Sequence, residues 1–287
     1  MTSAYHLHEG PRQFYPELGC DWIILSDAGG NVPPLTDFAL AAKALRDMLM
    51  AAWKGPIPEV ISGHTADGNP SQRPHMAILP LSFVGPKLAD GRLMGLAVAL
   101  PSSEVSDEPD QHEVIKVGIL ESLERSDASA IEVRLGSRGV WMVELRAAPY
   151  GLSLDPARYT KESSVWATVT PIVLNKFPKA GLSTEAILAD ACAHIGLPRP
   201  SETDVRVVRT SAIAGSPPAR SGNRQWGDGG WSLPARRDGS RHPFEDRLST
   251  HAVIRFTEQV SGPVVLGAGR FLGLGLCMPI EDAEAQR

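Results

Sequence analysis

The sequence is poor in cysteine, and it lacks a long apolar run. Its three cysteines are an odd number without the paired spacing of a zinc site, which argues against a disulfide framework and against a cysteine-ligated metal. No run approaches the roughly 18 apolar residues of a membrane span, and the N-terminus MTSAYHLHEG lacks the basic-then-apolar pattern of a signal peptide. These absences predict a protein of a reducing compartment, the cytoplasm, with no membrane partner.

The sequence also has no overall excess of positive charge. Its formal net charge is −5, so the chain as a whole does not have the charge of a nucleic-acid binder. One segment departs from this balance. Between Val205 and Arg255 there are nine arginines and only four acidic residues, in a stretch rich in glycine, serine and proline that also contains Trp226 and Trp231. This composition predicts phosphate contacts by arginine and stacking of unpaired bases on tryptophan, with a solvated insertion as the alternative.

Glycines are plentiful near the C-terminus, but they do not form a nucleotide-binding motif. The spacing of Gly267, Gly269 and Gly273 does not fit G-x-G-x-x-G, and only about a dozen residues follow Gly275, too few for a crossover helix and a further strand. No Gly-Lys-Ser/Thr follows, which excludes a P-loop. The remaining explanations are a glycine-rich bend before an edge strand and a backbone that closely approaches a ligand.

Hydrophobic residues make up 43% of the chain, which is ample for a packed core, and their periodicity predicts two similar series of elements. In the first half we expect strands at 21–26, 76–84, 93–100, 131–135 and 140–145, a helix after a Thr36 cap, a polar loop at 56–74 and a helix around 114–123. In the second half we expect strands at 165–174, 205–210 and 251–256 and a helix at 183–195, with room for only a stub of helix before the glycines.

Both series follow the order β-α-β-β-α-β, complete in the first and abbreviated in the second. We therefore predict an α+β fold of two tandem ferredoxin-like (RRM-like) domains, 1–155 and 156–287. The second would carry an Arg/Gly-rich insertion at 213–249 and a glycine-rich loop at 267–275. A single mixed α+β domain is the alternative.

Several motifs resemble a known family. The glycine loop resembles that of the CRISPR-associated RAMP proteins, particularly the endoribonucleases that cut precursor CRISPR RNA, although the spacer between its Gly-x-Gly elements is short. The similarity extends from about Asp21 to Pro279 and is closest to the repeat-processing half of the fused RAMP protein of type I-U (I-G) systems. It rests on SGHTADG at 62–68, RPHMA at 73–77, ADGRLMG at 89–95, WATVTP at 166–171 and LGAGR at 266–270.

The resemblance implies an endoribonuclease that binds the repeat hairpin of precursor CRISPR RNA and stays with the mature guide in a type I interference complex with other subunits. Cleavage in this family uses no metal or other cofactor: the 2′-hydroxyl attacks its own phosphate and leaves a 2′,3′-cyclic phosphate. In the subfamily another RAMP half, which holds the 5′ end of the guide, usually precedes the processing half. This sequence lacks it, so we expect a stand-alone protein, a split gene product or a fragment, without the 5′-handle function.

Two histidines are the catalytic candidates. His64 follows the first predicted helix in a polar loop, where many family members place their catalytic histidine. Histidine suits a general base because the unperturbed pKa of this residue type is about 6.5. His75 opens the next strand and is a candidate for proton transfer to the leaving group or for anchoring the sheet edge. A metal site of His64, Asp67 and His75 is a weaker alternative, because the spacing matches no helical metal motif. We therefore expect no metal.

The expected RNA contacts come from the glycine loop, from the arginine-rich segment and from two further cations. They are Gly267, Gly269, Arg270, Gly273, Gly275, Arg73, Arg224, Arg236, Arg237, Arg241 and Lys176.

Two other functions remain open at this point. One is a non-catalytic guide-RNA-binding subunit, in which His64 would be dispensable for RNA maturation. The other is a metal-dependent small-molecule hydrolase built on the loop of His64 and His75, which chelators would inactivate. An arginine-rich segment has no obvious use in such a hydrolase.

Overall fold

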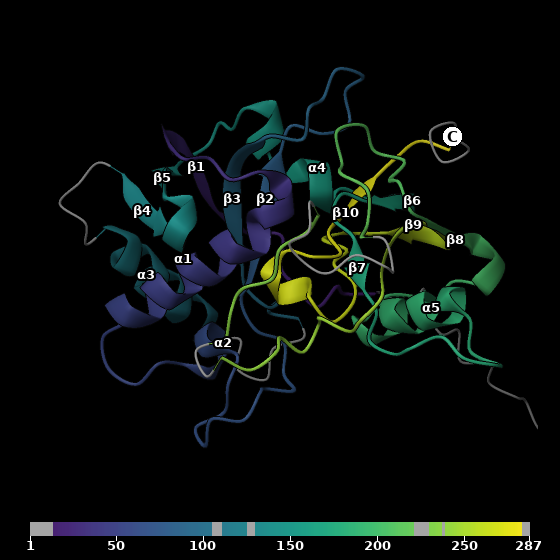
Figure 1. Ribbon diagram of the computed structural model, residues 1–287, viewed down its shortest axis with the longest axis horizontal. Helices are drawn as coiled ribbons and strands as arrows, with labels where there is room; N and C mark the ends of the chain where they lie inside the picture. The colour runs from purple at the N-terminus through teal and green to yellow at the C-terminus, as the bar shows by residue number, and fades with distance from the viewer. Residues whose placement is uncertain (1–13, 105–110, 125–129, 221–229, 237–238, 283–287) are drawn as a thin grey trace, which may run out of the picture.

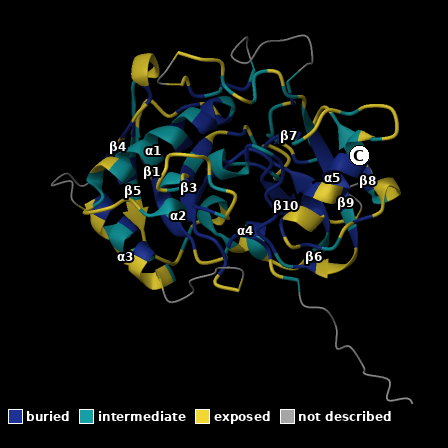
Figure 2. Cartoon of the chain, turned by 90° about the horizontal axis from the view of Figure 1, so that it is seen from below, coloured by how far each residue is buried: buried dark blue, intermediate teal, exposed yellow. Residues whose placement is uncertain are grey.

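The fold is taken from a computed structural model that describes residues 14–104, 111–124, 130–220, 230–236 and 239–282. It contains two antiparallel sheets with helices packed on them, and the two units lie side by side (Figure 1). Each sheet carries a large buried cluster of apolar side chains, and Figure 2 shows this buried interior running through both units. The arrangement is the α+β, tandem ferredoxin-like fold that the sequence predicts.

The first sheet has five strands in the order β2-β3-β1-β5-β4, so the first and third strands lie next to each other at its centre. Its strands are β1 (Ile23–Gly30), β2 (Ala77–Ser82), β3 (Leu93–Ala99), β4 (Ile131–Arg134) and β5 (Val140–Arg146). The helices of this unit are α1 (Phe38–Ala52), α2 (Glu59–Ser62) and α3 (Gln111–Glu124). On α1, buried residues recur every three or four positions, which turns one apolar face to the sheet.

Two expectations for this unit were wrong in detail. Thr36 does not cap α1, because the chain already turns in a 3-10 segment, η1 (Leu35–Asp37), and the residue at the N-cap position is Asp37. The stretch at 56–74 is not all loop, since α2 forms within it and ends at Gly63 in the left-handed conformation.

The second sheet contains β6 (Ser163–Thr168), β7 (Ile172–Val173), β8 (Val205–Val208), β9 (Ser249–Val260) and β10 (Cys277–Pro279). Its order is β10-β6-β9-β7, and β8 also pairs with β9. The expected strand at 165–174 is divided into β6 and β7. Pro171 lies in the gap between them, and a proline cannot donate a hydrogen bond to a neighbouring strand.

Only one long helix, α5 (Thr184–His194), packs on the second sheet in the described residues, and it contacts β8. Its cap is Ser183, whose hydroxyl accepts a hydrogen bond from the Ala186 amide at 2.9 Å. Where the second helix of a ferredoxin-like unit would lie, between β9 and β10, the chain has the glycine loop and one 3-10 turn, η5 (Arg270–Leu272). The expected stub of helix is thus present.

The glycine loop packs between the two units instead of lying on the surface. A side chain at Gly273 would lie 2.8 Å from the Ile78 carbonyl oxygen of β2, and one at Gly275 would lie 1.9 Å from the Leu266 carbonyl oxygen. Both residues have positive φ, 75° and 79°. Glycine is therefore required here for close packing of one backbone on another.

We expect Gly275→Ala to lower the free energy of unfolding by about 3 kcal/mol, because the added carbon meets a backbone oxygen and the left-handed conformation is strained. Urea unfolding measures the change. Gly151→Ala is the matched control, since Gly151 has φ −68° and no atom within 4 Å of the added carbon, and it should change stability by less than about 0.5 kcal/mol. Equal effects of the two substitutions would contradict the packing role of Gly275.

The described part of the insertion at 213–249 folds back onto the first unit. The Ser232 amide donates to the Thr36 carbonyl at 2.8 Å, and the Ser232 hydroxyl donates to Asp37 at 2.6 Å. Arg138 forms an ion pair with the same Asp37 carboxylate. The indole of Trp231 is only 1% exposed and donates to the Pro218 carbonyl, so its expected role in base stacking was wrong. Trp226 lies outside the described residues.

Within the described residues, no helix has both the length and the apolar character needed to cross a lipid bilayer.

Candidate active site

A cavity of about 630 Å³ lies where the insertion covers α1 and the loop after α2. One wall comes from the first unit and the other from the insertion, and Leu272 of η5 also lines the cavity. The lining residues are Lys43, Arg46, Asp47, Met50, Ser62, His64, Pro70, Pro234, Ala235, Arg236, His242, Pro243, Phe244 and Leu272. The cavity therefore combines apolar surface, which suits a nucleobase, with two histidines and three cationic side chains.

His64 lies exposed at this cavity, immediately after the left-handed Gly63. Its Nδ1 lies 3.0 Å from the Ser62 carbonyl oxygen. Because a carbonyl oxygen only accepts, Nδ1 carries the hydrogen and Nε2 keeps its lone pair in the neutral ring. The Ser62 hydroxyl also bonds the His64 amide at 3.2 Å, which fixes the backbone beside the ring. His64 thus presents a free basic nitrogen from a well-held turn.

His75 is next to this turn but does not line the cavity. His75 is 9% exposed, and its ring lies on the Phe271 ring with centroids 3.5 Å apart. Its Nε2 lies 2.9 Å from the place that a β-carbon at Gly63 would occupy. Burial, followed by the positive charge of Arg46, lowers the pKa of His75 to about 3. His75 is therefore neutral at physiological pH, which is unsuited to protonating a leaving group and well suited to supporting the turn that carries His64.

The cations of the cavity on α1 are held in place by defined partners. Arg46 donates from Nη2 to the Met76 carbonyl at 2.5 Å and to the Phe271 carbonyl at 3.0 Å. Burial lowers its pKa to about 10, which leaves the guanidinium charged at neutral pH. One turn earlier on the helix, Lys43 bonds Asp47 at 2.5 Å. Sequence reasoning missed both, because they look like ordinary polar positions on an amphipathic helix.

The other sequence-predicted RNA contacts are scattered. Arg236 lines the cavity, Arg73 is exposed two residues before His75, and Lys176 is exposed beyond β7. Arg241 is exposed outside the cavity and forms ion pairs with Glu245 and Asp246. The remaining two arginines of the prediction, Arg224 and Arg237, lie outside the described residues.

Arg270 and the four loop glycines are occupied within the protein. The Arg270 guanidinium forms a bidentate pair with Glu17, at 2.7 and 3.0 Å, and both side chains are nearly buried. The predicted loop glycines are buried as well. They are Gly267, Gly269, Gly273 and Gly275. Their contact with RNA stays a prediction. Close packing of the loop by itself explains why glycine occupies each of these positions.

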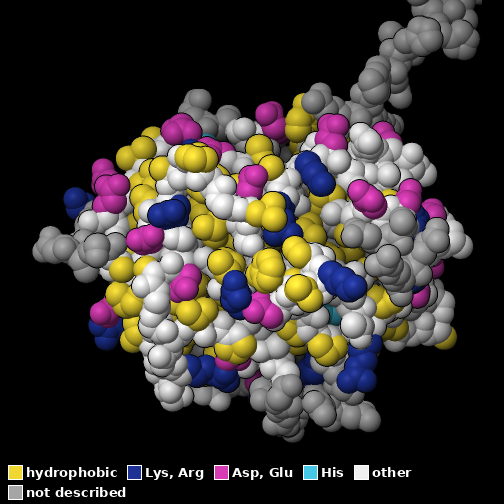
Figure 3. All heavy atoms as spheres, turned by 90° about the horizontal axis from the view of Figure 1, so that it is seen from above, with side chains coloured by type: hydrophobic (Ala, Val, Ile, Leu, Met, Phe, Trp, Pro, Cys, Tyr) yellow, Lys and Arg dark blue, Asp and Glu magenta, His cyan; other side chains and the backbone are white. Residues whose placement is uncertain are grey.

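Within the described residues, several arginines of the second half are engaged inside the protein. Arg247 donates to the Leu174 and Asn175 carbonyls, and Arg220 donates to the Arg247 carbonyl. These arginines of the insertion thus donate hydrogen bonds to backbone carbonyl oxygens that no helix or strand partner would bond. On the face shown in Figure 3, basic and acidic side chains are intermixed among hydrophobic and other side chains. His251, which also flanks this segment, is fully buried between Thr168 and the Pro217 carbonyl.

The possible metal ligands of the sequence are not gathered. Asp67 bonds Thr65 and Asn69, and His75 faces the Arg73 carbonyl and Gly63. Across the described parts of the chain, no three His, Cys, Asp or Glu side chains are grouped so that they could hold a metal ion.

Residues 35–279 match the family described as CRISPR-associated protein, GSU0054 family. The chain belongs to this family. Membership confirms the resemblance to CRISPR-associated proteins that the motifs indicate, whereas the I-U or I-G subtype stays a prediction. The match begins just before α1 and ends at β10, so it includes every wall of the cavity.

Comparison with curated protein sequences gives no match. Among solved structures, the Cas6 (TTHB231) product complex is similar with a TM-score of 0.43 and 16% identity, over 90% of this chain and 98% of that chain. A structure described as CRISPR associated protein Cas6 has a TM-score of 0.37 and 10% identity, over 91% and 98% of the two chains.

Proposed function

We propose that this protein is an endoribonuclease that binds the repeat of precursor CRISPR RNA and cuts it to give guide RNA. The observation that carries the proposal is the free Nε2 of His64 at a cavity lined by Lys43, Arg46 and Arg236, in a member of a CRISPR-associated family. A basic nitrogen beside fixed positive charge is the minimum that RNA cleavage by its own 2′-hydroxyl requires.

In the proposed reaction Nε2 of His64 takes the proton of the 2′-hydroxyl beside the cut site. The 2′-oxygen then bonds to phosphorus, the bond from phosphorus to the 5′-oxygen breaks, and that oxygen takes a proton from water. The products are a 2′,3′-cyclic phosphate and a 5′-hydroxyl. No step requires a metal or another cofactor.

The other residues of the site have supporting roles in this scheme. Arg46, held by two carbonyl oxygens, places a fixed positive charge beside the phosphate, and Arg236 adds a second from the insertion. His75 positions His64 through its packing against Gly63. Arg73, Arg241 and Lys176, exposed away from the cavity, are proposed contacts for the rest of the repeat hairpin. After cleavage we propose that the protein retains the guide and joins other subunits of an interference complex.

The test is cleavage of an end-labelled CRISPR repeat RNA by the wild-type protein in EDTA. We expect one cut and a product whose 3′ end is a cyclic phosphate, identified by mass spectrometry. A repeat with a single 2′-deoxynucleotide at the cut site should bind equally well and resist cleavage, because the attacking oxygen is missing. Tight binding of the ribose repeat without any cut would instead identify a guide-RNA-binding subunit. Activity lost in EDTA would point to a metal-dependent hydrolase.

A further inference from the structure

The insertion contributes a second histidine to the cavity, His242, on the wall formed by residues 234–236 and 242–244. His64 belongs to the first unit, so the two rings reach one cavity from opposite halves of the chain. His242 is half-buried, and its neighbours along the wall are Pro243 and Phe244. The Phe244 ring meets the His242 ring edge-on, with centroids 4.7 Å apart.

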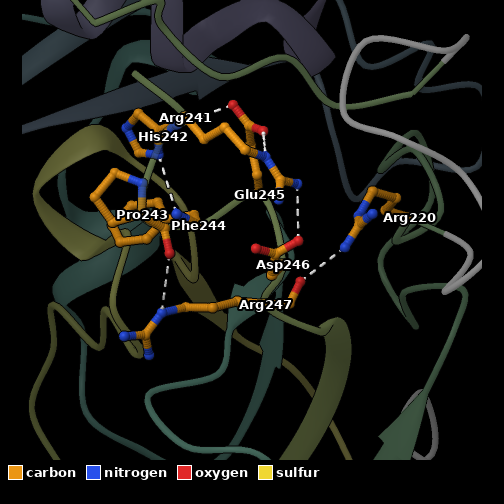
Figure 4. Close-up of polar contacts among 8 residues, drawn as sticks. All are labelled: Arg220, Arg241, His242, Pro243, Phe244, Glu245, Asp246 and Arg247. Carbon is orange, nitrogen blue, oxygen red and sulfur yellow. Dashed lines mark hydrogen bonds and ion pairs between the residues drawn. The ribbon is translucent and has the colours of Figure 1, made fainter.

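His242 is carried by a tightly bonded turn (Figure 4). The His242 amide donates to the Glu245 carboxylate at 2.8 Å, and the Glu245 amide donates back to the His242 carbonyl at 2.9 Å. Arg241 holds the same carboxylate at 2.8 Å and also bonds Asp246. This reciprocal bonding resembles a helix capping box and fixes the backbone at His242.

The turn is also fastened to the second sheet. Arg247 donates from Nη1 to the carbonyl oxygens of Leu174 and Asn175, at 3.0 and 2.5 Å, just beyond β7. On the other side of the cavity wall, Ser232 is bonded to Thr36 and Asp37. The two described parts of the wall are thus each anchored, and the bonds of the turn at 241–247 make His242 a preorganised group.

The hydrogen bonds of the ring specify which nitrogen carries the proton. The Phe244 amide donates to Nδ1 of His242 at 3.2 Å, so Nδ1 has a lone pair and the hydrogen of the neutral ring is on Nε2. Burial lowers the pKa of His242, and Glu245 only partly opposes this shift. A second proton on Nδ1 would also break the bond from Phe244. His242 is thus a neutral donor, the complement of His64, whose Nε2 is an acceptor.

We propose that His242 donates its Nε2 hydrogen to a non-bridging oxygen of the scissile phosphate and stabilises the charge that develops there. This inference rests on the proposed function. His242 keeps its proton throughout, so no proton transfer passes through it. A preorganised donor of this kind acts on the transition state more than on the bound substrate.

The test compares His242→Ala and His242→Gln in single-turnover cleavage of the labelled repeat. We expect alanine to slow cleavage about 100-fold with an unchanged Kd for the repeat, because the donor is lost. The glutamine amide carries an N–H at nearly the position of Nε2, so this variant should stay within about fivefold of wild type. His194→Ala, at the exposed end of α5, is the matched control and should cut at the wild-type rate.

Three outcomes would overturn the inference. Alanine at the wild-type rate would show that His242 is dispensable, and glutamine as slow as alanine would show that the ring or a proton transfer matters instead of the N–H. A loss of thermal stability common to both variants, together with the loss of rate, would show a structural role. In all three cases the wild-type protein still cuts, which leaves the proposed function standing. Failure of the wild type to cut would overturn both.

Discussion

Replacing His64 with alanine is expected to slow cleavage of the repeat about 1,000-fold while leaving its Kd unchanged. His64 is exposed and its bonds lie within its own turn, so the substitution removes the basic Nε2 without disturbing a neighbouring element. Arg46 and Arg236, which we propose supply charge to the phosphate, stay in place. Single-turnover cleavage and a filter-binding titration of the same RNA measure the two quantities.

Adding free imidazole to the His64→Ala protein tests whether His64 acts as a base. His64→Ala leaves space at an open cavity of about 630 Å³, and imidazole added to this variant should restore part of the rate. It should not accelerate the 2′-deoxy repeat, which has no hydroxyl to deprotonate. If His64→Ala cuts at the wild-type rate, His64 is not the general base. The proposed function then loses the observation on which it rests.

The element order of the fold was predictable because periodicity is local. The buried face of α1 follows from the spacing of apolar residues within the helix itself. The start of α5 follows from Ser183 directly before it. The details that failed depend on distant partners. Asp37, and not Thr36, lies at the N-cap position, and its carboxylate bonds Arg138 and Ser232 of other elements instead of capping the helix.

The site was predictable only in part, since His64 and Arg236 were predicted from the sequence whereas Lys43 and Arg46 were not. His64 stands out in a polar stretch after a helix, where a histidine has little reason to be buried. His242 stands out only once the insertion has folded over α1, since nothing in its own neighbourhood distinguishes it from the other histidines near the arginine-rich segment. Trp231 shows the opposite error, because a tryptophan among arginines and glycines suggests RNA stacking until its packing is known.

Arg270→Met is expected to lower the free energy of unfolding by about 3 kcal/mol, because it leaves the nearly buried Glu17 carboxylate without its bidentate partner. Glu17→Gln should have a similar effect, since it leaves the guanidinium over the Phe271 ring without a counter-charge. The double variant should be less destabilised than the sum of the two, which is the signature of a direct pair. Urea unfolding of all four proteins completes the cycle.

The same variants separate a packing role of Arg270 from the RNA contact that the sequence predicts. If Arg270 joins the glycine loop to the segment before β1, its loss weakens folding and leaves the Kd of the folded protein for the repeat unchanged. If Arg270 contacts RNA, Arg270→Met weakens repeat binding, whereas Glu17→Gln frees the guanidinium and strengthens it. Opposite effects of the two substitutions on Kd would therefore contradict the packing role. If the two side chains only hold the loop, losing either one should change Kd in the same direction or not at all.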